Sequence, residues 1–209
     1  MSNNPSGNLF VIAAPSGAGK TSLVKALSES MSQLQISISH TTRAMRPAEK
    51  NGENYFFIDP ETFHDMVEKK AFLEHAAVFG NHYGTSKAWV FEKLSMGIDV
   101  VLEIDWQGAQ QVHRLFSEAV LIFILPPSIA ALKSRLQSRQ QDCADIIAQR
   151  MQAAQNETSH FSEFDYLVVN DQFDSAVNDL KNIVLAMRLK TSLQKVKQAA
   201  LLENLLKKQ

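Results

Sequence analysis

The stretch spanning residues 9–27, LFVIAAPSGAGKTSLVKAL, constrains the fold more than any other part of the sequence. Residues 9–13 form an unbroken apolar run, which is typical of a strand buried on both faces of a parallel sheet. Small residues and glycines follow directly, and from Lys20 onward apolar side chains recur with the 3.6-residue period of a helix. The stretch therefore predicts a buried strand, a tight loop and a helix, in that order.

The loop of this unit, residues 14–21, has the composition of a phosphate-binding loop. The N–H groups of such a loop converge on an anion, and the N-terminus of the following helix attracts negative charge. The segment resembles a Walker A motif, in which a lysine reaches the β- and γ-phosphates and a hydroxyl binds magnesium; these are Lys20 and Thr21 here. Ala14 replaces the motif's first glycine, which is compatible with the loop if that position needs no positive φ. We predict phosphate binding, rather than an ordinary small-residue turn, at Ala14, Pro15, Ser16, Gly17, Ala18, Gly19, Lys20 and Thr21.

Composition excludes several other classes of protein. A chain of 209 residues suits one compact domain, and its formal net charge of −1 gives no overall field that favours nucleic acid or an anionic membrane. The single Cys143 cannot form an internal disulfide, and His and Cys lack metal-ligand spacing, which suits a reducing cytosol and argues against a zinc site. No leader is apparent, and no apolar run approaches the ~20 residues that span a bilayer, so we expect a cytoplasmic protein.

Two arginines mark the segment that follows the first helix. Residues 36–39 are predicted to form a second short strand, and Arg43 and Arg46 come next, three residues apart and just before a proline. Planar guanidinium groups on one side of a turn can hold a phosphate through paired hydrogen bonds. Considered alone, such a pair is more commonly a solvated basic loop.

A small β-rich insertion is predicted next. Residues 55–58 and 72–85 have the composition of short strands and turns, and a helix begins at Pro60 between them. Glu74 is unusual because it lies within the largely apolar run FLEHAAVF. A carboxylate in such a run normally faces water, and contact with a ligand is the alternative.

Residues 100–105, VVLEID, form another apolar strand that ends in acid. This ending resembles a Walker B strand, whose carboxylate helps to hold magnesium or its water, and both Glu103 and Asp105 are candidates. Asp105 also begins the sequence DWQG, which matches the D-x-x-G of GTPases. A match with two free positions is weak, and no guanine-reading N-K-x-D follows, so the sequence does not favour a GTPase switch.

Arginines recur after the fourth predicted strand, residues 119–125. The helix predicted at 128–139 carries Arg135 and Arg139 one turn apart, a like-charge pair that destabilises a free helix slightly, and the next helix carries Arg150. A polar helical excursion with repeated arginines suggests a lid over phosphates, although a solvated face explains these arginines equally well.

The last predicted strand, residues 166–170, precedes a long helix that continues towards Leu206. The leucines near its end could pack on the chain's own sheet or on another subunit, and core packing is the simpler expectation. These are Leu201, Leu202, Leu205 and Leu206.

Apolar strands separated by helices predict parallel pairing with right-handed crossovers. The fold class is therefore α/β, with a five-stranded, doubly wound parallel sheet and helices on both faces. The phosphate loop and Asp105 fall at the carboxyl edge of the strands, where open α/β sheets bind ligands. Within a single domain, 1–209, we assign 8–37, 88–127 and 161–209 to the core, 38–87 to the insertion and 128–160 to the lid.

Several of these segments together resemble one family. SHTTRAMRPAEKNGENYFF, FLEHAAVFGNHYGTS, VVLEIDWQG and LKSRLQSR, with Arg150 beyond, occur in the order and spacing of bacterial-type guanylate kinases. These are P-loop nucleoside monophosphate kinases that transfer phosphate from ATP to GMP. The resemblance covers nearly the whole chain, and its most specific part, residues 39–57, is similar to the family's GMP-binding signature.

The resemblance implies a role for each candidate residue. The GMP phosphate would be held by Arg43, Arg46, Tyr55 and Tyr83, and guanine would face Ser39, Glu74, Thr85 and Asp105. The catalytic residues would be Lys20, Arg43, Arg135, Arg139 and Arg150. ATP with Mg²⁺, held in part by Thr21, would be the donor, GMP and also dGMP the acceptors, and a homo-oligomer is possible.

Two alternatives share much of this pattern. Another monophosphate kinase would have the loop and the lid but should lack a carboxylate that faces guanine. A noncatalytic scaffold domain of guanylate-kinase type would bind peptides, but such domains typically lose loop or arginine chemistry, whereas Lys20, Thr21 and every proposed arginine are present.

Overall fold

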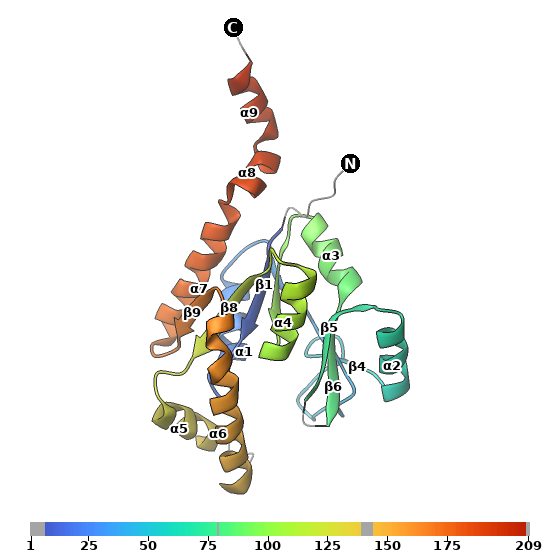
Figure 1. The fold of residues 1–209 in the computed structure, drawn as a ribbon, viewed down its shortest axis with the longest axis vertical. Helices are drawn as coiled ribbons and strands as arrows, with labels where there is room; N and C mark the ends of the chain where they lie inside the picture. Colours follow the sequence, from blue (N-terminus) through green and yellow to red (C-terminus); the bar gives the residue numbers. More distant parts are fainter. Residues whose placement is uncertain (1–6, 79, 139–143, 208–209) are drawn as a thin grey trace.

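The computed structural model describes residues 7–78, 80–138 and 144–207, and its centre is a twisted parallel sheet (Figure 1). Five strands form this sheet in the order β2-β7-β1-β8-β9, and every neighbouring pair is parallel. The arrangement confirms the predicted five-stranded parallel sheet. The strands are β1 (Leu9–Ala13), β2 (Leu34–Ile36), β7 (Asp99–Glu103), β8 (Val120–Leu125) and β9 (Tyr166–Val169).

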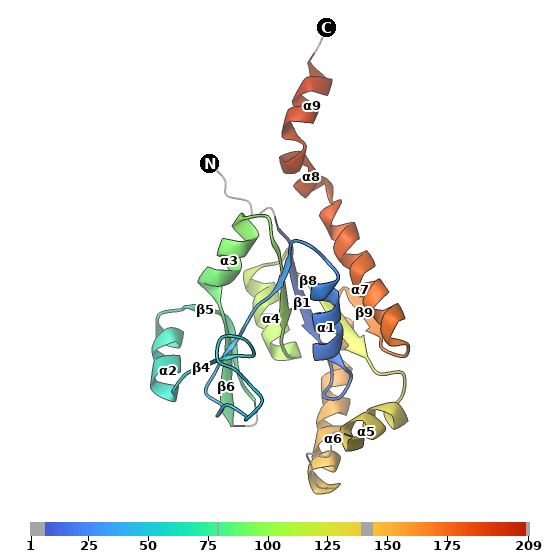
Figure 2. The same ribbon diagram turned by 180° about the vertical axis from the view of Figure 1, so that it is seen from behind.

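Helices cover both faces of this sheet, as predicted. The helices α1 (Lys20–Glu29) and α7 (Phe173–Arg188) pack on one face, and α3 (Lys87–Ser95) and α4 (Trp106–Leu115) pack on the other. The helix α4 lies in front of the sheet in Figure 1, and α1 lies in front of it in Figure 2. The apolar side chains predicted to share one face of α1 are buried against the sheet; they are Leu23, Val24 and Leu27.

A second, smaller sheet stands beside the first. Its strand order is β4-β3-β6-β5, and its strands are β3 (His40–Thr41), β4 (Phe56–Phe57), β5 (Phe72–Val78) and β6 (Asn81–Ser86). The helix α2 (Pro60–Glu68) contacts β5, and Asp59 caps its N-terminus by accepting from the Thr62 N–H at 2.8 Å. All four strands lie within the segment predicted to be a β-rich insertion.

The strand predicted at residues 36–39 is wrong in its position. The strand β2 ends at Ile36, and Ser37 N makes one further bond to Val101 O at 2.9 Å. The chain then crosses to the second sheet, where Ser39 O accepts from Phe56 N at 2.9 Å. Residues 36–39 therefore span the passage between two sheets, and a local pattern of apolar residues does not reveal which sheet a strand joins.

Two further helices, α5 (Ile129–Ser138) and α6 (Ala144–Ser159), lie side by side at the end of the molecule opposite the two termini (Figure 1). Leu132, Leu136 and Ala154 form a small apolar cluster between them, separate from those of the sheet. A 3₁₀ helix, His160–Glu163, leads from α6 towards β9. Arg139 and Cys143 lie outside the described residues.

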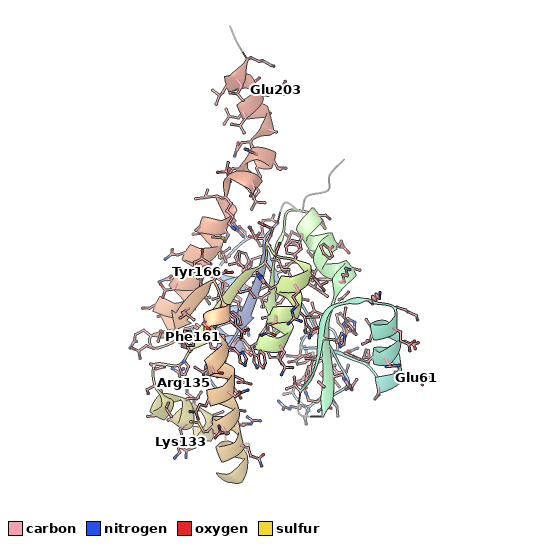
Figure 3. All side chains as sticks on the ribbon, viewed as in Figure 1. Glu61, Lys133, Arg135, Phe161, Tyr166 and Glu203 are labelled. Atoms are coloured by element: carbon pink, nitrogen blue, oxygen red, sulfur yellow. The ribbon has the colours of Figure 1, made fainter. Side chains whose placement is uncertain are left out.

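The single long C-terminal helix that the sequence predicts is instead three helices. After α7 come α8 (Thr191–Lys197) and α9 (Ala199–Leu206), and the backbone at Lys190 is not helical, with φ −53° and ψ 135°. The four terminal leucines are 53%, 37%, 71% and 79% exposed, so the expectation of core packing is also wrong. Figure 3 explains this exposure: Glu203 on α9 lies far beyond the sheet, at the opposite end of the molecule from Lys133 and Arg135. Among the described helices, none has the length and apolar character that crossing a membrane requires.

Candidate active site

The glycine-rich loop joins β1 to α1 at the carboxyl edge of the main sheet. Gly17 and Gly19 have φ of 94° and 93°, a region that side-chain-bearing residues rarely adopt. Ala14 is not among the non-glycine residues with positive φ in the described chain, so the condition that made alanine acceptable at this position is met. The N-cap residue of α1 is Gly19, which has no side chain with which to cap the helix. Its N–H groups and its dipole therefore favour a bound anion.

Asn170, which the sequence analysis did not single out, supports this loop from the end of β9. Its side chain is 5% exposed and donates to Ala18 O at 2.7 Å. Arg135 reaches the same place from α5, with Nη2 donating to Asn170 O at 2.9 Å and Nη1 to Ala18 O at 3.3 Å. A Cβ on Gly19 would come within 2.5 Å of Asn170 Nδ2, so glycine is required here for close approach as well as for φ. The sequence signal for Asn170 is a polar residue directly after the apolar run of a strand.

Lys20 and Thr21 both point towards the carboxyl end of β7. The Lys20 ammonium donates to Ile104 O at 2.7 Å, and the Thr21 hydroxyl donates to the Glu103 carboxylate. The structure therefore brings together the lysine and hydroxyl of the loop with one of the two acids predicted to order magnesium. The oxygen atoms of Thr21 and Glu103 are the hard ligands that magnesium or its waters prefer.

The second acid, Asp105, has a different local role. It is the N-cap of α4, and its Oδ1 accepts from Gly108 N at 2.8 Å. The D-x-x-G match is therefore a helix cap in this fold. A Cβ on Gly108 would lie 2.8 Å from Glu74 Oε2, so the glycine leaves room for that carboxylate.

Glu74 lies at the centre of a buried polar cluster. It pairs with Thr85 across β5 and β6, is 4% exposed, and accepts from the Thr85 hydroxyl at 2.5 Å. The Ser39 hydroxyl lies 3.5 Å from that of Thr85. The pKa of Glu74 is raised to about 7, chiefly because burial disfavours the charged form. The nearby Asp105 also raises this pKa, whereas the hydrogen bond from Thr85 lowers it. The structure thus brings Ser39, Glu74 and Thr85 together, and the alternative in which Glu74 faces water is wrong.

This carboxyl group makes the stability of the nucleotide-free protein depend on pH. A raised pKa means that the folded state holds the proton more tightly than the unfolded state. The resulting stabilisation is fully present below the ordinary pKa of 4.5 and is lost as the pH rises through about 7. The shift corresponds to roughly 3 kcal/mol. We expect the free energy of unfolding of the wild type to fall by about that amount relative to Glu74→Gln over this interval.

Urea unfolding at a series of pH values measures this difference. The matched control is Glu61→Gln, because Glu61 is an exposed acid on α2 of the same insertion (Figure 3). Its difference from the wild type should stay nearly constant over the same interval. Parallel pH curves for the wild type and Glu74→Gln would show that Glu74 does not titrate near neutrality.

The predicted phosphate-holding residues gather around Arg43, which lies just after β3 beside the second sheet. The Arg43 guanidinium lies 5.5 Å from the Tyr55 ring centre, and the Tyr55 and Tyr83 rings are 5.9 Å apart. Glu49, which the sequence analysis missed, accepts from Arg43 Nη2 at 2.7 and 3.0 Å and from Arg46 N at 2.9 Å. This pairing raises the pKa of Arg43 and lowers that of Glu49. Arg46 is exposed. The sequence signal that could have identified Glu49 is an acidic residue three positions after Arg46.

The three arginines predicted for the lid occupy different positions. Arg135 contacts the phosphate loop through the bonds described above. Arg150 is half-buried on α6, and Arg139 lies outside the described residues. The structure therefore brings Arg135 to the loop, and the contact of all three arginines with phosphates stays a prediction.

The fold and the site together define a class of protein. A parallel α/β sheet carries a glycine-rich loop at its carboxyl edge, directly before a helix N-terminus, with Lys20 and Thr21 beside the acid that ends the neighbouring strand. This arrangement is that of the P-loop nucleotide-binding proteins.

Comparison with known proteins identifies the family within this class. The family model described as guanylate kinase matches residues 6–187. Guanylate kinase from Legionella pneumophila (strain Lens) is 54% identical over 209 residues, covering 100% of both chains, and that from Hahella chejuensis is 57% identical over 203 residues, covering 97% of this chain and 98% of the relative. The crystal structure of guanylate kinase from Anaplasma phagocytophilum superposes with a TM-score of 0.75 at 30% identity, covering 92% of this chain and 95% of that one. The chain belongs to the guanylate kinase family, as its sequence motifs predicted.

Proposed function

We propose that this protein catalyses the ATP-dependent phosphorylation of GMP, and also of dGMP, to the diphosphate. The observation that carries the proposal is the buried carboxylate of Glu74, hydrogen-bonded to Thr85 in the second sheet, in a chain whose loop is built for phosphate. Burying a carboxylate is energetically unfavourable unless hydrogen-bond donors or an opposite charge compensate for the lost water. Guanine offers such a partner, because its N1–H and 2-amino group are adjacent donors that one carboxylate accepts together.

The donor nucleotide occupies the glycine-rich loop in this proposal. The loop N–H groups and Lys20 hold the β- and γ-phosphates of ATP, and Lys20 exchanges its bond to Ile104 O for a phosphate oxygen. Thr21 and Glu103 together supply oxygen ligands for Mg²⁺ or its waters, which makes Glu103, rather than Asp105, the acid of the magnesium site. When bound, Mg²⁺ neutralises charge on the phosphates.

The acceptor nucleotide occupies the second sheet. Guanine meets Glu74, and the Ser39 and Thr85 hydroxyls reach its O6, with Asp105 close by. Arg43, Arg46, Tyr55 and Tyr83 hold the GMP phosphate. Glu49 keeps Arg43 in place before the nucleotide arrives. Arg43 can still bind the GMP phosphate, because a guanidinium that bonds to one carboxylate has further N–H donors for a second anion.

No protein nucleophile is needed for the transfer itself. An oxygen of the GMP phosphate attacks the γ-phosphorus of ATP, the bond to the ADP oxygen breaks, and no covalent enzyme intermediate forms. The protein's contribution is alignment and cancellation of charge by Lys20, Arg43 and the lid arginines Arg135, Arg139 and Arg150. Closure of the segment 128–160 over the phosphates excludes water, which would otherwise compete as acceptor.

One coupled assay tests this function. ADP formation from ATP is followed with GMP, dGMP, AMP, CMP and UMP as acceptors in turn. We expect turnover with GMP and dGMP and very little with the others. Turnover with a different monophosphate would assign the protein to another monophosphate kinase, and GMP binding without turnover with any acceptor would favour a noncatalytic scaffold.

A variant in the lid tests the charge-cancelling role of the arginines. We expect Arg150→Ala to lower kcat about 10²- to 10³-fold with little change in the KM for GMP, because Arg150 meets the phosphates only when the lid closes. Arg139→Ala should behave in the same way. The matched control is Lys133→Ala, since Lys133 is an exposed cation on α5 (Figure 3). Wild-type turnover in both arginine variants would show that these residues lie on a solvated face and do not act on the phosphates.

We further propose that residues 38–87 act as the GMP-binding unit and 128–160 as the lid of a single domain. A cytoplasmic location and the absence of nucleic-acid and membrane partners are supported by the charge balance and by the lone cysteine. A homo-oligomer stays a prediction of the sequence.

A further inference from the structure

The helix α6 contacts the phosphate loop through a residue that none of the roles above uses. Glu157 lies in the last turns of α6, and its Oε2 accepts from the backbone N–H of Ser16 at 2.9 Å. The two residues are 141 positions apart, so only the tertiary fold brings them together. Ser16 belongs to the loop in which N–H groups converge on an anion. Glu157 therefore brings a negative charge to a loop whose N–H groups favour an anion.

The contact is one of several between the lid helices and the loop. The helix α5 approaches with Leu132 and Leu136, each 3.0 Å from the position of a Cβ on Gly17, and α6 approaches with Glu157. The apolar contacts would survive the arrival of a charged ligand. The carboxylate contact is different, because its partner is an N–H group at the place where phosphate is expected.

The charges around Glu157 make the contact sensitive to an incoming anion. Burial raises the pKa of Glu157, the Ser16 N–H and Lys20 lower it, and Asp105 raises it. Lys20 is also the cation assigned to the donor phosphates. A nucleotide phosphate in the loop would engage Lys20 and repel the carboxylate at short range in a partly buried site, where such repulsion is weakly screened.

We propose that Glu157 is a positioning residue that holds α6 against the phosphate loop through the Ser16 N–H and is displaced when the donor phosphates bind. Nucleotide binding and the loss of the hydrogen bond between Glu157 and Ser16 are then one coupled event, which lets α6 move with the rest of the segment 128–160 as it closes, and part of the binding free energy is spent on breaking this contact. The inference rests on the proposed function, since it assumes that ATP and ADP occupy the loop.

The test measures the affinity for MgADP, without GMP, by calorimetric titration of the intact protein. Glu157→Ala removes both the acceptor and the charge, so we expect ADP to bind about tenfold more tightly than to the wild type, the scale of a hydrogen bond to a charged group. Glu157→Gln keeps an oxygen that can accept from Ser16 but removes the charge, and should tighten binding by less. The matched control is Glu163→Gln, because Glu163 bonds to Gln110 and His160 away from the loop, and it should bind like the wild type.

Steady-state kinetics give a readout that a purely structural role would not move. A damaged fold weakens nucleotide binding, whereas the proposal expects a lower KM for ATP without a higher kcat, since ADP leaves more slowly. Affinity in Glu157→Ala that equals or falls below the wild-type value overturns the proposal. Should that variant not fold, Glu157→Gln decides in the same way.

Lys20→Met separates a failure of this inference from a failure of the proposed function. If that variant loses ADP affinity while the Glu157 variants match the wild type, the loop binds the donor and only the role of Glu157 is wrong. If Lys20→Met binds ADP normally, the assignment of the loop as the binding site of the donor nucleotide is wrong.

Discussion

Lys20→Met should lower the rate of phosphate transfer by at least about 10³-fold while leaving GMP binding nearly unchanged. Lys20 belongs to the loop assigned to the donor nucleotide, and its ammonium donates a hydrogen bond to Ile104 O at the carboxyl end of β7. The GMP site is built from different elements, since Arg43 and Glu74 both belong to the second sheet region. Removing the charge therefore weakens the interaction with the transferring phosphate and leaves the acceptor's contacts intact.

Two measurements check this result: the coupled rate of ADP formation, and calorimetric titration of GMP into the variant. Lys25→Met is the matched control, because Lys25 is an exposed lysine on the same helix, paired with Glu29 at 3.9 Å. It should keep the wild-type rate. If Lys20→Met keeps the wild-type rate, the loop does not take part in the transfer. If the variant loses GMP binding, the donor and acceptor sites are not independent.

Glu74→Ala should abolish much of the discrimination between GMP and AMP. Adenine has an acceptor at N1 and no 2-amino group, so AMP would leave the buried carboxylate unpaired. Sites built to hydrogen-bond a substrate group reject analogues that lack it by about 10⁴- to 10⁵-fold. We expect the variant to lose roughly 1.5–3 kcal/mol in kcat/KM for GMP, the scale of hydrogen bonds to a charged group, and the GMP-to-AMP ratio to narrow.

The ratio of the two kcat/KM values is the decisive quantity, because it cancels any loss of active protein. Glu61→Ala, in the same insertion but on the exposed side of α2, should leave that ratio unchanged. Wild-type activity and wild-type discrimination in Glu74→Ala would show that Glu74 does not read the base. The substrate assignment would then depend on family membership alone.

Predictions from sequence were accurate wherever a local pattern determines burial. The apolar runs of β1, β7 and β8, each buried along nearly its whole length, could only suit the interior of a parallel sheet. The phosphate loop was equally clear, because glycines, lysine and hydroxyl are adjacent in the chain. The misplaced strand at 36–39 marks where this reasoning stops, since the choice between two sheets depends on residues far away in the sequence.

The C-terminal helices show a second limit. The leucines of α9 have the spacing of an apolar face, but spacing does not specify what lies against that face. The chain leaves the helical conformation at Lys190, between α7 and α8, and the leucine side chains of α9 beyond it are exposed.

By itself, the sequence determined the fold class and the family, and it nominated most of the candidate residues, because all of these depend on neighbours in the chain and on motifs of fixed spacing. Only the tertiary structure decided which of those residues meet. It buried Glu74 beside Thr85, chose Glu103 over Asp105 as the partner of Thr21, and added Asn170, Glu49 and Glu157 to the loop and the arginine cluster. Such contacts depend on sheet order and helix packing, and a hydrogen bond across 141 residues leaves no periodic trace in the sequence.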